Sequence, residues 1–386
     1  MGRFSFDARE LAGAVADVGV LVPIAVVLIV ANGLSATAVV LPAGLLYLTA
    51  ALVYRLPIPV QPLKAFGAIA IARGLGADVI ACGALLMGVI FLSLGRSGLV
   101  DRVAKAFPRP VIRGVQLTVG LLFLKIAWGL VDHPSHAFAG QAAAGAWWVV
   151  PAAGALLALS LVLRRRLVTL ALVAVGLGAA FGDGAALAFG PSAIELPAID
   201  WHSLETAFVV LVVPQVPLTF ANSCLATADA ARTYFRERAD RVAPGRLATT
   251  LGIANLFSGA ISGMPVCHGA GGLTAHYSFG ARTGGAPLML GSALVVLALA
   301  AGAGLASLLA AFPLPILAGL LAAAGVLHIG LLRDLPGPEA WAVALGVGAV
   351  GFAYNLAVAL GIGLAAWWLQ RLTERALRRR GLRATS

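Results

Sequence analysis

Long, continuous apolar segments follow one another along almost the whole chain. Of its 386 residues, 60% are hydrophobic and 11% are charged, against roughly 25% charged in an average soluble domain. A water-exposed surface cannot be built from so few charges, so much of the apolar surface must face lipid. Within a bilayer, only helices and closed barrels pair all their backbone hydrogen-bonding groups. Because the apolar runs do not alternate with polar residues, the sequence predicts an all-α polytopic membrane protein.

The apolar segments number about fourteen and divide into two sets of seven. Most approach the length of about 20 residues that a transmembrane helix needs, but the third and tenth are short and broken by Pro or Gly. The first set comprises Ala14–Ala31, Ala36–Tyr54, Val60–Ala72, Asp78–Leu94, Val111–Val131, Trp147–Leu163 and Val168–Phe181. The second set comprises Thr206–Ala226, Leu247–Ser262, Val266–Phe279, Pro287–Leu305, Pro315–Leu331, Ala340–Phe352 and Leu356–Leu372.

An internal repeat relates the two sets. The segment Phe107–Gly114 (FPRPVIRG) reappears as Phe312–Gly319 (FPLPILAG), 205 positions later. The dipeptide Pro59-Val60 reappears as Pro265-Val266, 206 positions later, and each copy opens a short segment. An odd number of spans in each repeat turns the second copy upside down in the membrane. We therefore expect a 7+7 inverted repeat, formed by residues 1–200 and 201–386.

Basic residues lie in alternate connections between the predicted spans. With the N-terminus in the cytoplasm, the outer connections contain only Arg73 among Lys and Arg, and one of them carries Glu195, Asp200 and Glu205. An excess of basic residues on the cytoplasmic side is the usual orientation signal of membrane proteins. We therefore expect both termini to be cytoplasmic, in a bacterial inner membrane. The formal net charge of +11 is then an orientation signal, and no nucleic-acid partner is expected.

Nothing in the sequence points to an enzyme, a metal or a cofactor. Cys82, Cys224 and Cys267 lie in apolar surroundings without the spacing of metal ligands. Cys267 is followed by His268, but no third group that could orient a nucleophilic pair is evident. We also expect neither a cleaved signal peptide nor an appended soluble domain.

The two short segments occupy matching positions in the repeats, which in such transporters predicts the binding site. Residues before proline favour extended backbone, so Leu56–Pro62 (LPIPVQP) should be extended, and Pro62 can begin a helix. Met264–Gly272 (MPVCHGAGG) should do the same with glycines. The unpaired amides and the positive dipole end of each helix attract an anion. We expect a compact oxyanion to bind between the N-termini of helices 3 and 10.

Polar side chains around these helix ends extend the predicted site. Lys64 lies in the first turn of a helix, where its positive charge opposes the helix dipole. An anion that is attracted by both the ammonium group and the free amides explains this position better than snorkelling of the side chain to the membrane interface. Gln61 can donate to the anion or to neighbouring backbone, and His268 can bind the anion or be a hydrogen-bonded core histidine. The predicted substrate-binding residues are Gln61, Leu63, Lys64, Ala65, Gln215, Thr219, Asn222, His268, Gly269, Ala270 and Gly271, and the proton-coupling candidates are Asp17, His268 and His276.

At these segments the sequence resembles the MOT1-type molybdate transporter family. Pro59–Ala65 (PVQPLKA) is similar to the first family signature, and Met264–Leu273 (MPVCHGAGGL), continuing to Gly284, is similar to the second. Pro214–Thr219 (PQVPLT) with Asn222 resembles the motif that precedes the second signature. The sequence departs from the family at Leu63, usually Met, and at His276, usually Gln. The second departure bears on substrate preference.

The resemblance implies the SLC26/UraA-like inverted-repeat fold, shared with the distantly related SulP/SLC26-like sulfate permeases. Those permeases carry a C-terminal STAS domain, which this sequence lacks, and its absence favours the molybdate branch. The resemblance also implies a core of spans 1–4 and 8–11 (about 14–95 and 206–305). The core would move against a gate of spans 5–7 and 12–14 (about 107–182 and 312–372).

We therefore expect a secondary active transporter that imports molybdate, with tungstate or sulfate as further substrates and protons as the coupling ion. Two alternatives stay open. One is a sulfate permease without a STAS domain, because molybdate and sulfate share their charge and tetrahedral shape. The other is an oxyanion channel that uses the same pocket. The sequence also leaves a homodimer open.

Overall fold

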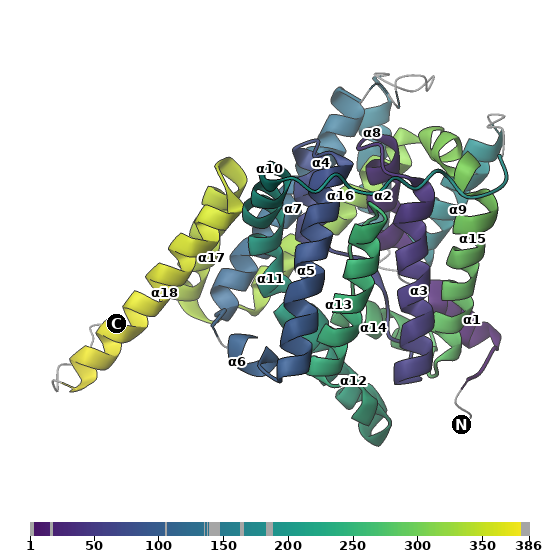
Figure 1. Cartoon of the computed structure of the whole chain (residues 1–386). Coiled ribbons are helices and arrows are strands. Elements are labelled where there is room, and N and C mark those ends of the chain that lie inside the picture. The colour runs from purple at the N-terminus through teal and green to yellow at the C-terminus, as the bar shows by residue number, and fades with distance from the viewer. Residues whose placement is uncertain are drawn as a thin grey trace.

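The protein is a bundle of helices that encloses one pair of short antiparallel strands (Figure 1). The structure is a computed structural model, and it describes residues 4–15, 18–104, 106–134, 136, 138, 147–162, 166–182 and 188–379. In Figure 1, α1, α6, α12 and the last turns of α18 lie toward the lower side, whereas α8 and α10 lie at the upper side.

The first repeat runs to the end of α9. A short amphipathic helix, α1, precedes the first apolar helix, and a second short helix, α6, follows α5. The elements are α1 (Ala8–Ala14), α2 (Val18–Val30), α3 (Ala36–Tyr54), β1 (Gln61–Pro62), α4 (Lys64–Ala72), α5 (Ala77–Ser97), α6 (Val100–Ala104), α7 (Arg109–Asp132), α8 (Val149–Val162) and α9 (Arg166–Gly182).

The second repeat begins with one long helix that is α-helical at α10, α11 and α12 and π-helical between them. Its elements are α10 (Trp201–Thr206), η2 (Ala207–Val212), α11 (Val213–Leu218), η3 (Thr219–Ala226), α12 (Thr227–Phe235) and the 3₁₀ turn η4 (Arg236–Arg241). There follow α13 (Pro244–Ala260), β2 (Val266–Cys267), α14 (Ala270–Ser278), α15 (Gly285–Ala310), α16 (Leu314–Gly330), the 3₁₀ turn η5 (Leu331–Asp334), α17 (Gly337–Ala353) and α18 (Leu356–Arg379).

A helix lies at each of the fourteen predicted segments. Within the described residues, seven helices are long and apolar enough to cross a membrane, and three shorter apolar helices accompany them. The chain is therefore a multi-pass membrane protein, and the number of fourteen crossings stays a prediction. The third and tenth segments are short as predicted, because α4 and α14 have nine residues each. At 1.5 Å per residue, such a helix spans about 14 Å, roughly half of the hydrocarbon core.

The two repeats meet about an approximate two-fold axis. Strands β1 and β2 are antiparallel, and Gln61 pairs with Cys267. These two residues are 206 positions apart, the same offset that separates Pro59-Val60 from Pro265-Val266. Equivalent residues of the two repeats therefore pair with each other, which places the axis of the repeat at the strand crossing.

The helices pack in two groups. Helix α3 packs along α15, and α5 packs along α13, on the side of the molecule that faces the viewer in Figure 1. Helix α7 packs against α16 and α17, and α16 also contacts α8. The two groups touch through α4 and α11 against α7 and through α2 against α16. Arg109 and Arg113 at the start of α7 both form ion pairs with Asp334 in η5, which joins the lower ends of α7 and α16.

An extended segment, residues 188–200, links the two repeats and lies across the upper ends of the first group (Figure 1). Gly190 N donates to Ala300 O of α15 at 2.8 Å, and Ala198 N donates to Asp78 of α5 at 2.9 Å. Ser192 exchanges hydrogen bonds of 2.8 Å with Thr37 of α3 in both directions. The connection is thus bonded to three helices of the first group.

A buried carboxylate anchors the N-terminal helix to the loop between α14 and α15. Glu10 is only 2% exposed. Its carboxylate accepts hydrogen bonds from the backbone amides of Arg282 at 2.8 Å, Thr283 at 2.9 Å and Ala286 at 3.2 Å. These amides open α15, where the helix dipole favours a negative charge. The sequence did not predict this contact, because Glu10 precedes the first apolar segment.

Helices α7 and α16 approach closely at two glycines that are 205 positions apart. An added Cβ at Gly120 would lie 2.7 Å from Gly325 O, and one at Gly325 would lie 2.7 Å from Gly120 O. Valine at either position should destabilise the protein by about 1–3 kcal/mol, since the backbones must separate. The measurement is the unfolding temperature of the purified protein in detergent. Gly129→Val in α7 is the matched control, because nothing lies within 4 Å of its added Cβ; equal effects of the two substitutions in α7 would contradict the close crossing.

Candidate anion-binding site

The extended segment before α4 offers more backbone acceptors than donors. Pro57, Pro59 and Pro62 have no N–H group, so Leu56–Pro62 is rich in carbonyl groups that need partners. The segment is buried throughout. A buried carbonyl without a partner costs free energy, and no lipid can supply a donor. Side chains from the surrounding helices must therefore donate to it.

Two histidines of the second repeat supply these donors. His276 Nδ1 lies 3.0 Å from Pro57 O, and His268 Nδ1 lies 2.9 Å from Pro59 O. A carbonyl can only accept, so each Nδ1 carries the proton. The Nε2 atom of His268 lies 3.4 Å from the hydroxyl of Thr250, which is itself 2.6 Å from the hydroxyl of Tyr54. Both ring nitrogens of His268 thus face protein groups.

Two further side chains hold equivalent residues of the strands. Tyr47 of α3 donates to Val60 O at 3.0 Å. Asn255 of α13 binds both backbone groups of Val266, accepting from its N–H at 2.8 Å and donating to its carbonyl at 2.9 Å. Val60 and Val266 are 206 positions apart, so each repeat fixes the same point of its broken segment from the preceding helix. Leu63 N adds a bond to Pro265 O at 3.1 Å.

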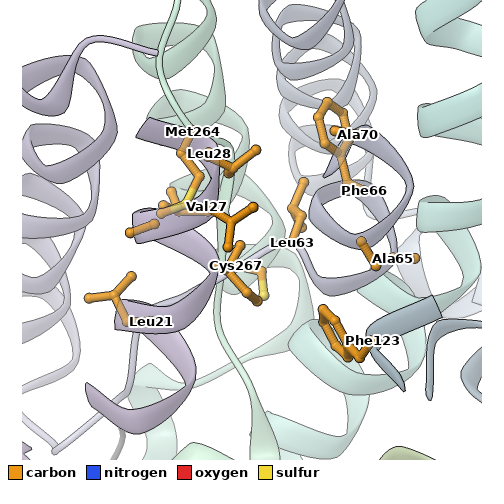
Figure 2. Close-up of a cluster of buried hydrophobic side chains, with 14 of the residues drawn as sticks. Leu21, Val27, Leu28, Leu63, Ala65, Phe66, Ala70, Phe123, Met264 and Cys267 are labelled. Carbon is orange, nitrogen blue, oxygen red and sulfur yellow. The ribbon is translucent and has the colours of Figure 1, made fainter. Parts of the chain in front are cut away.

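An apolar cluster packs behind the strand crossing (Figure 2). Leu21, Val27 and Leu28 of α2 face Met264 and Cys267 of the second broken segment. On the other side of the cluster lie the residues of α4 and one ring of α7, which are Leu63, Ala65, Phe66, Ala70 and Phe123. The apolar packing lies on one side of the crossing. We call the side on which Lys64, Asn222, Ala270 and Gly271 are not fully buried the open side.

The N-termini of α4 and α14 both begin at this crossing without a side-chain cap from Leu63 or Gly269, their N-cap residues. In α4, the third amide, that of Phe66, donates to Gln215 Oε1 at 3.0 Å. The amides of Lys64 and Ala65 have no acceptor among the described residues. Two helix starts that meet with their positive dipole ends can share one anion, and α4 adds the amides of Lys64 and Ala65.

The eighth span, which carries Gln215 and Thr219, changes helix type around its two prolines. Pro214 and Pro217 lack the N–H groups that would bond Val210 O and Val213 O, and π-helical stretches lie on both sides of the prolines. Such widened turns recur at functional sites. Gln215 Nε2 donates to Thr219 Oγ1 at 3.1 Å, which orients the Gln215 carbonyl toward α4. Gln215, which is oriented by Thr219, therefore accepts a hydrogen bond from the first turn of α4.

Four residues converge at the open side of the crossing. The Lys64 ammonium donates to Gln61 Oε1 at 2.7 Å. A Cβ added at Gly269 would lie 2.5 Å from Gln61 Oε1 and 3.3 Å from Asn222 Nδ2. The absence of a side chain at Gly269 therefore lets Gln61 and Asn222 approach the start of α14. The site combines Lys64 and Gln61 of the first repeat with the Asn222 side chain and the bare backbone of Gly269 of the second.

The charge of this site is positive. Among the described residues, no carboxylate forms an ion pair with Lys64. The side chain lies in the first turn of α4, where the dipole repels a cation. An anion at this position would compensate both the ammonium group and the two helix ends.

The predicted site residues divide into three groups. Lys64, Asn222 and Ala270 are half-buried and Gly271 is exposed, so these four reach the open side. Gln61, Leu63, Ala65, Gln215, Thr219, His268 and Gly269 are buried around the crossing. His276 is buried beneath it, stacked on Tyr47, and Asp17 lies outside the described residues. His268 and His276 each donate a hydrogen bond to a backbone carbonyl group. Their roles in anion binding and in proton coupling stay predictions.

Sequence reasoning missed Asn255, Tyr47 and Thr250, which hold the broken segments, and His328 of α16. One signal was available for Asn255, because an amide in the middle of an apolar span usually marks a hydrogen bond between segments. Nothing in the sequence showed which backbone group it would bind.

Solved structures with the same fold are anion transporters. The transmembrane domain of the cyanobacterial bicarbonate transporter BicA matches with a TM-score of 0.64 and 18% identity, over 93% of this chain and 96% of that one. The murine Solute Carrier 26 family member A9 anion transporter matches with a TM-score of 0.69 and 14% identity, over 96% of this chain and 69% of that one. The chain therefore shares the fold of these transmembrane domains.

Relatives in sequence identify the family to which the chain belongs. The profile of the family described as "Molybdate transporter of MFS superfamily" matches residues 9–123 and 207–327. Molybdate transporter 1 of Arabidopsis thaliana is 30% identical over 373 residues, which cover 86% of this chain and 81% of that protein. Molybdate transporter 2 of the same plant is 28% identical, over 94% of this chain and 87% of that protein. The chain belongs to this molybdate transporter family, as the resemblance predicted.

Replacing Asn255 by leucine, which has a similar volume, should lower the unfolding temperature of the purified protein in detergent. The substitution removes both hydrogen bonds to Val266 and leaves a buried N–H and a buried carbonyl unpaired, each at a cost of about 1–3 kcal/mol. An unchanged unfolding temperature would show that Asn255 does not hold β2.

Proposed function

We propose that this chain is a secondary active transporter that imports molybdate, with tungstate and sulfate as competing anions. The anion binds between the N-termini of α4 and α14, in contact with Lys64, Gln61 and Asn222 and with the first amides of both helices. The observation that carries this proposal is the convergence, at one open side of the strand crossing, of the N-termini of α4 and α14 and the Lys64 ammonium, which has no carboxylate partner among the described residues.

The relatives support molybdate as the transported anion. Both Arabidopsis relatives are named molybdate transporters, and the site chemistry suits a tetrahedral oxyanion with several acceptor atoms. Lys64 supplies a charged donor, the helix starts supply fixed N–H groups, and Asn222 supplies an amide. Sulfate offers the same charge and shape, so selectivity must be measured directly.

Movement of one helix group against the other provides alternating access. The proposed core, about residues 14–95 and 206–305, contains α3, α5, α13 and α15, which pack on one another. The proposed gate, about residues 107–182 and 312–372, contains α7, α16 and α17, which do the same. The anion site lies on the core where α4 meets α7, so a relative shift would open it to either side.

The basic connections support a cytoplasmic location for both termini and for the lower side of Figure 1. Arg238 and Arg282 lie in connections of the same predicted side, and Arg238 donates to Arg282 O at 3.0 Å. A bacterial inner membrane is the proposed location, with the lipid bilayer as the surrounding partner.

Uptake of a dianion requires a coupling ion. Moving one charge against the membrane potential costs about 2.3 kcal/mol per 100 mV, so a dianion entering a negative interior costs about 4.6 kcal/mol. At about 1.4 kcal/mol per tenfold ratio, an uncoupled carrier would hold the internal concentration about three decades below the external one. We propose that protons accompany the anion.

Lys64→Gln and Gln61→Ala should each weaken the binding of molybdate to the purified protein. Loss of a charged hydrogen bond costs about 1.5–3 kcal/mol, which is roughly a tenfold or larger rise in Kd. The measurement is calorimetric titration with molybdate, repeated with sulfate and tungstate. Lys125→Gln is the matched control, because Lys125 is exposed on α7 and should leave the Kd unchanged. Wild-type affinity in both site variants would place the anion elsewhere, and tighter binding of sulfate than of molybdate would make the chain a sulfate transporter.

An inward proton gradient should drive accumulation of labelled molybdate in proteoliposomes, and a protonophore should abolish it. The reason is that the accompanying protons neutralise the transported charge. Accumulation that ignores both treatments but follows a sodium gradient would make sodium the coupling ion. Uptake that never exceeds the electrochemical equilibrium of molybdate would indicate a channel.

A further inference from the structure

Pairs of equivalent residues meet along the approximate two-fold axis. Gln61 pairs with Cys267 in the core, and in the other helix group Gly120 of α7 meets Gly325 of α16. One turn further along α7 and α16, Phe123 contacts His328 edge to face, with ring centroids 5.8 Å apart and an interplanar angle of 75°. Phe123 and His328 are also 205 positions apart. An ionisable ring thus stands on the axis where the other repeat has an apolar ring.

The imidazole of His328 has a defined orientation. Its Nδ1 lies 2.9 Å from Ala324 O of the preceding turn, so Nδ1 carries the proton and donates. Phe123 covers one side of the ring. The remaining atom for polar contacts is Nε2, which accepts in the neutral ring and donates in the protonated ring. No side chain or backbone group of the described residues is hydrogen-bonded to Nε2, and the residue is only half-buried.

The Phe123 ring connects His328 to the helix that packs against α4. Phe123 contacts His328 and lies in the same apolar cluster as Ala65 of α4 (Figure 2). Helix α4, which carries Lys64 in its first turn, packs against α7. The helices α2 and α8, which pack on α16, carry no ionisable side chain. The other elements that pack on α16 carry charged groups with known positions. On α7, Arg109 and Arg113 are paired with Asp334, Lys125 is exposed, and Asp132 bonds His133. Helix α9 carries Arg166, and η5 carries Arg333 and Asp334.

We propose that His328 is the gate-side ligand of the anion site and carries a co-transported proton when the oxyanion is bound. In this state the protonated ring donates from Nε2 to the anion, opposite the Lys64 ammonium. The inference rests on the proposed function and adds a residue, from the other helix group, to the site on α4 and α14.

Charge explains why proton and anion would bind together. Without an anion, the Lys64 ammonium opposes a second positive charge on His328. A dianion between the two groups attracts both, so its binding favours protonation of His328. By reciprocity, protonation strengthens binding of the anion by the same factor. Because Lys64 belongs to the core and His328 to the gate, the loaded anion would draw the two groups together.

The test compares molybdate Kd values of purified wild-type protein and His328→Gln at about pH 6 and about pH 8, on either side of the usual titration range of histidine. Wild-type protein should bind at least several-fold more tightly at the lower pH. The variant, which keeps a hydrogen-bonding group but cannot take up a proton, should show nearly the same Kd at both. In proteoliposomes, its uptake should no longer respond to a proton gradient. His202→Gln is the matched control, because His202 is exposed on α10 and should behave as wild type.

His328→Phe, which repeats the residue found at Phe123, provides a second variant and should bind more weakly than wild type at the lower pH. Unfolding temperatures confirm that the compared variants are folded. Wild-type pH dependence in both His328 variants would overturn the inference while leaving the anion site intact, provided that Lys64→Gln still weakens binding. If Lys64→Gln binds molybdate as tightly as wild type, the proposed site fails, and the role of His328 fails with it.

Discussion

Backbone hydrogen bonding in lipid is the constraint on which this structure depends. Two chain segments leave the helical conformation inside the membrane, and each then exposes N–H and carbonyl groups that lipid cannot satisfy. The two segments bond each other through the pair of Gln61 and Cys267. Further backbone carbonyl groups of the segments accept hydrogen bonds from the side chains of Tyr47, Asn255, His268 and His276. The starts of α4 and α14 lie together because this crossing holds the two helices in place.

The frame is symmetric, but the side chains placed on it are not. Lys64 stands at the start of α4, whereas its equivalent 206 positions later is Ala270 at the start of α14. Gln61 corresponds to Cys267 in the same way. The first repeat therefore contributes charge and amide groups, and the second contributes close backbone approach at Gly269. An approximate two-fold frame supplies two helix ends, and the side chains placed on it differ between the repeats.

The sequence predicted the elements better than the contacts between them. Apolar length and Pro/Gly breaks located α3 to the residue and placed the short helices α4 and α14, because these features act locally. The tasks of His268 and His276 depend on acceptors about 209 and 219 residues away, and no local pattern encodes such a pairing. His328 escaped notice for the same reason. It lies in an unbroken apolar segment, and only the crossing of α7 and α16 brings it against Phe123.

The strand pair also has a consequence for synthesis of the chain. The carbonyl groups of β1 enter the membrane region about 205 residues before their partners in β2 are made. At translation rates of about 5–20 residues per second, this interval lasts roughly 10–40 s. During that time the Leu56–Pro62 segment has no protein partner from the second repeat, so it is expected to stay near water, or against the insertion machinery, until residue 266 emerges. Completion of the crossing thus has to await synthesis of the second repeat, and a chain that ends before residue 266 leaves the Leu56–Pro62 segment without this pairing.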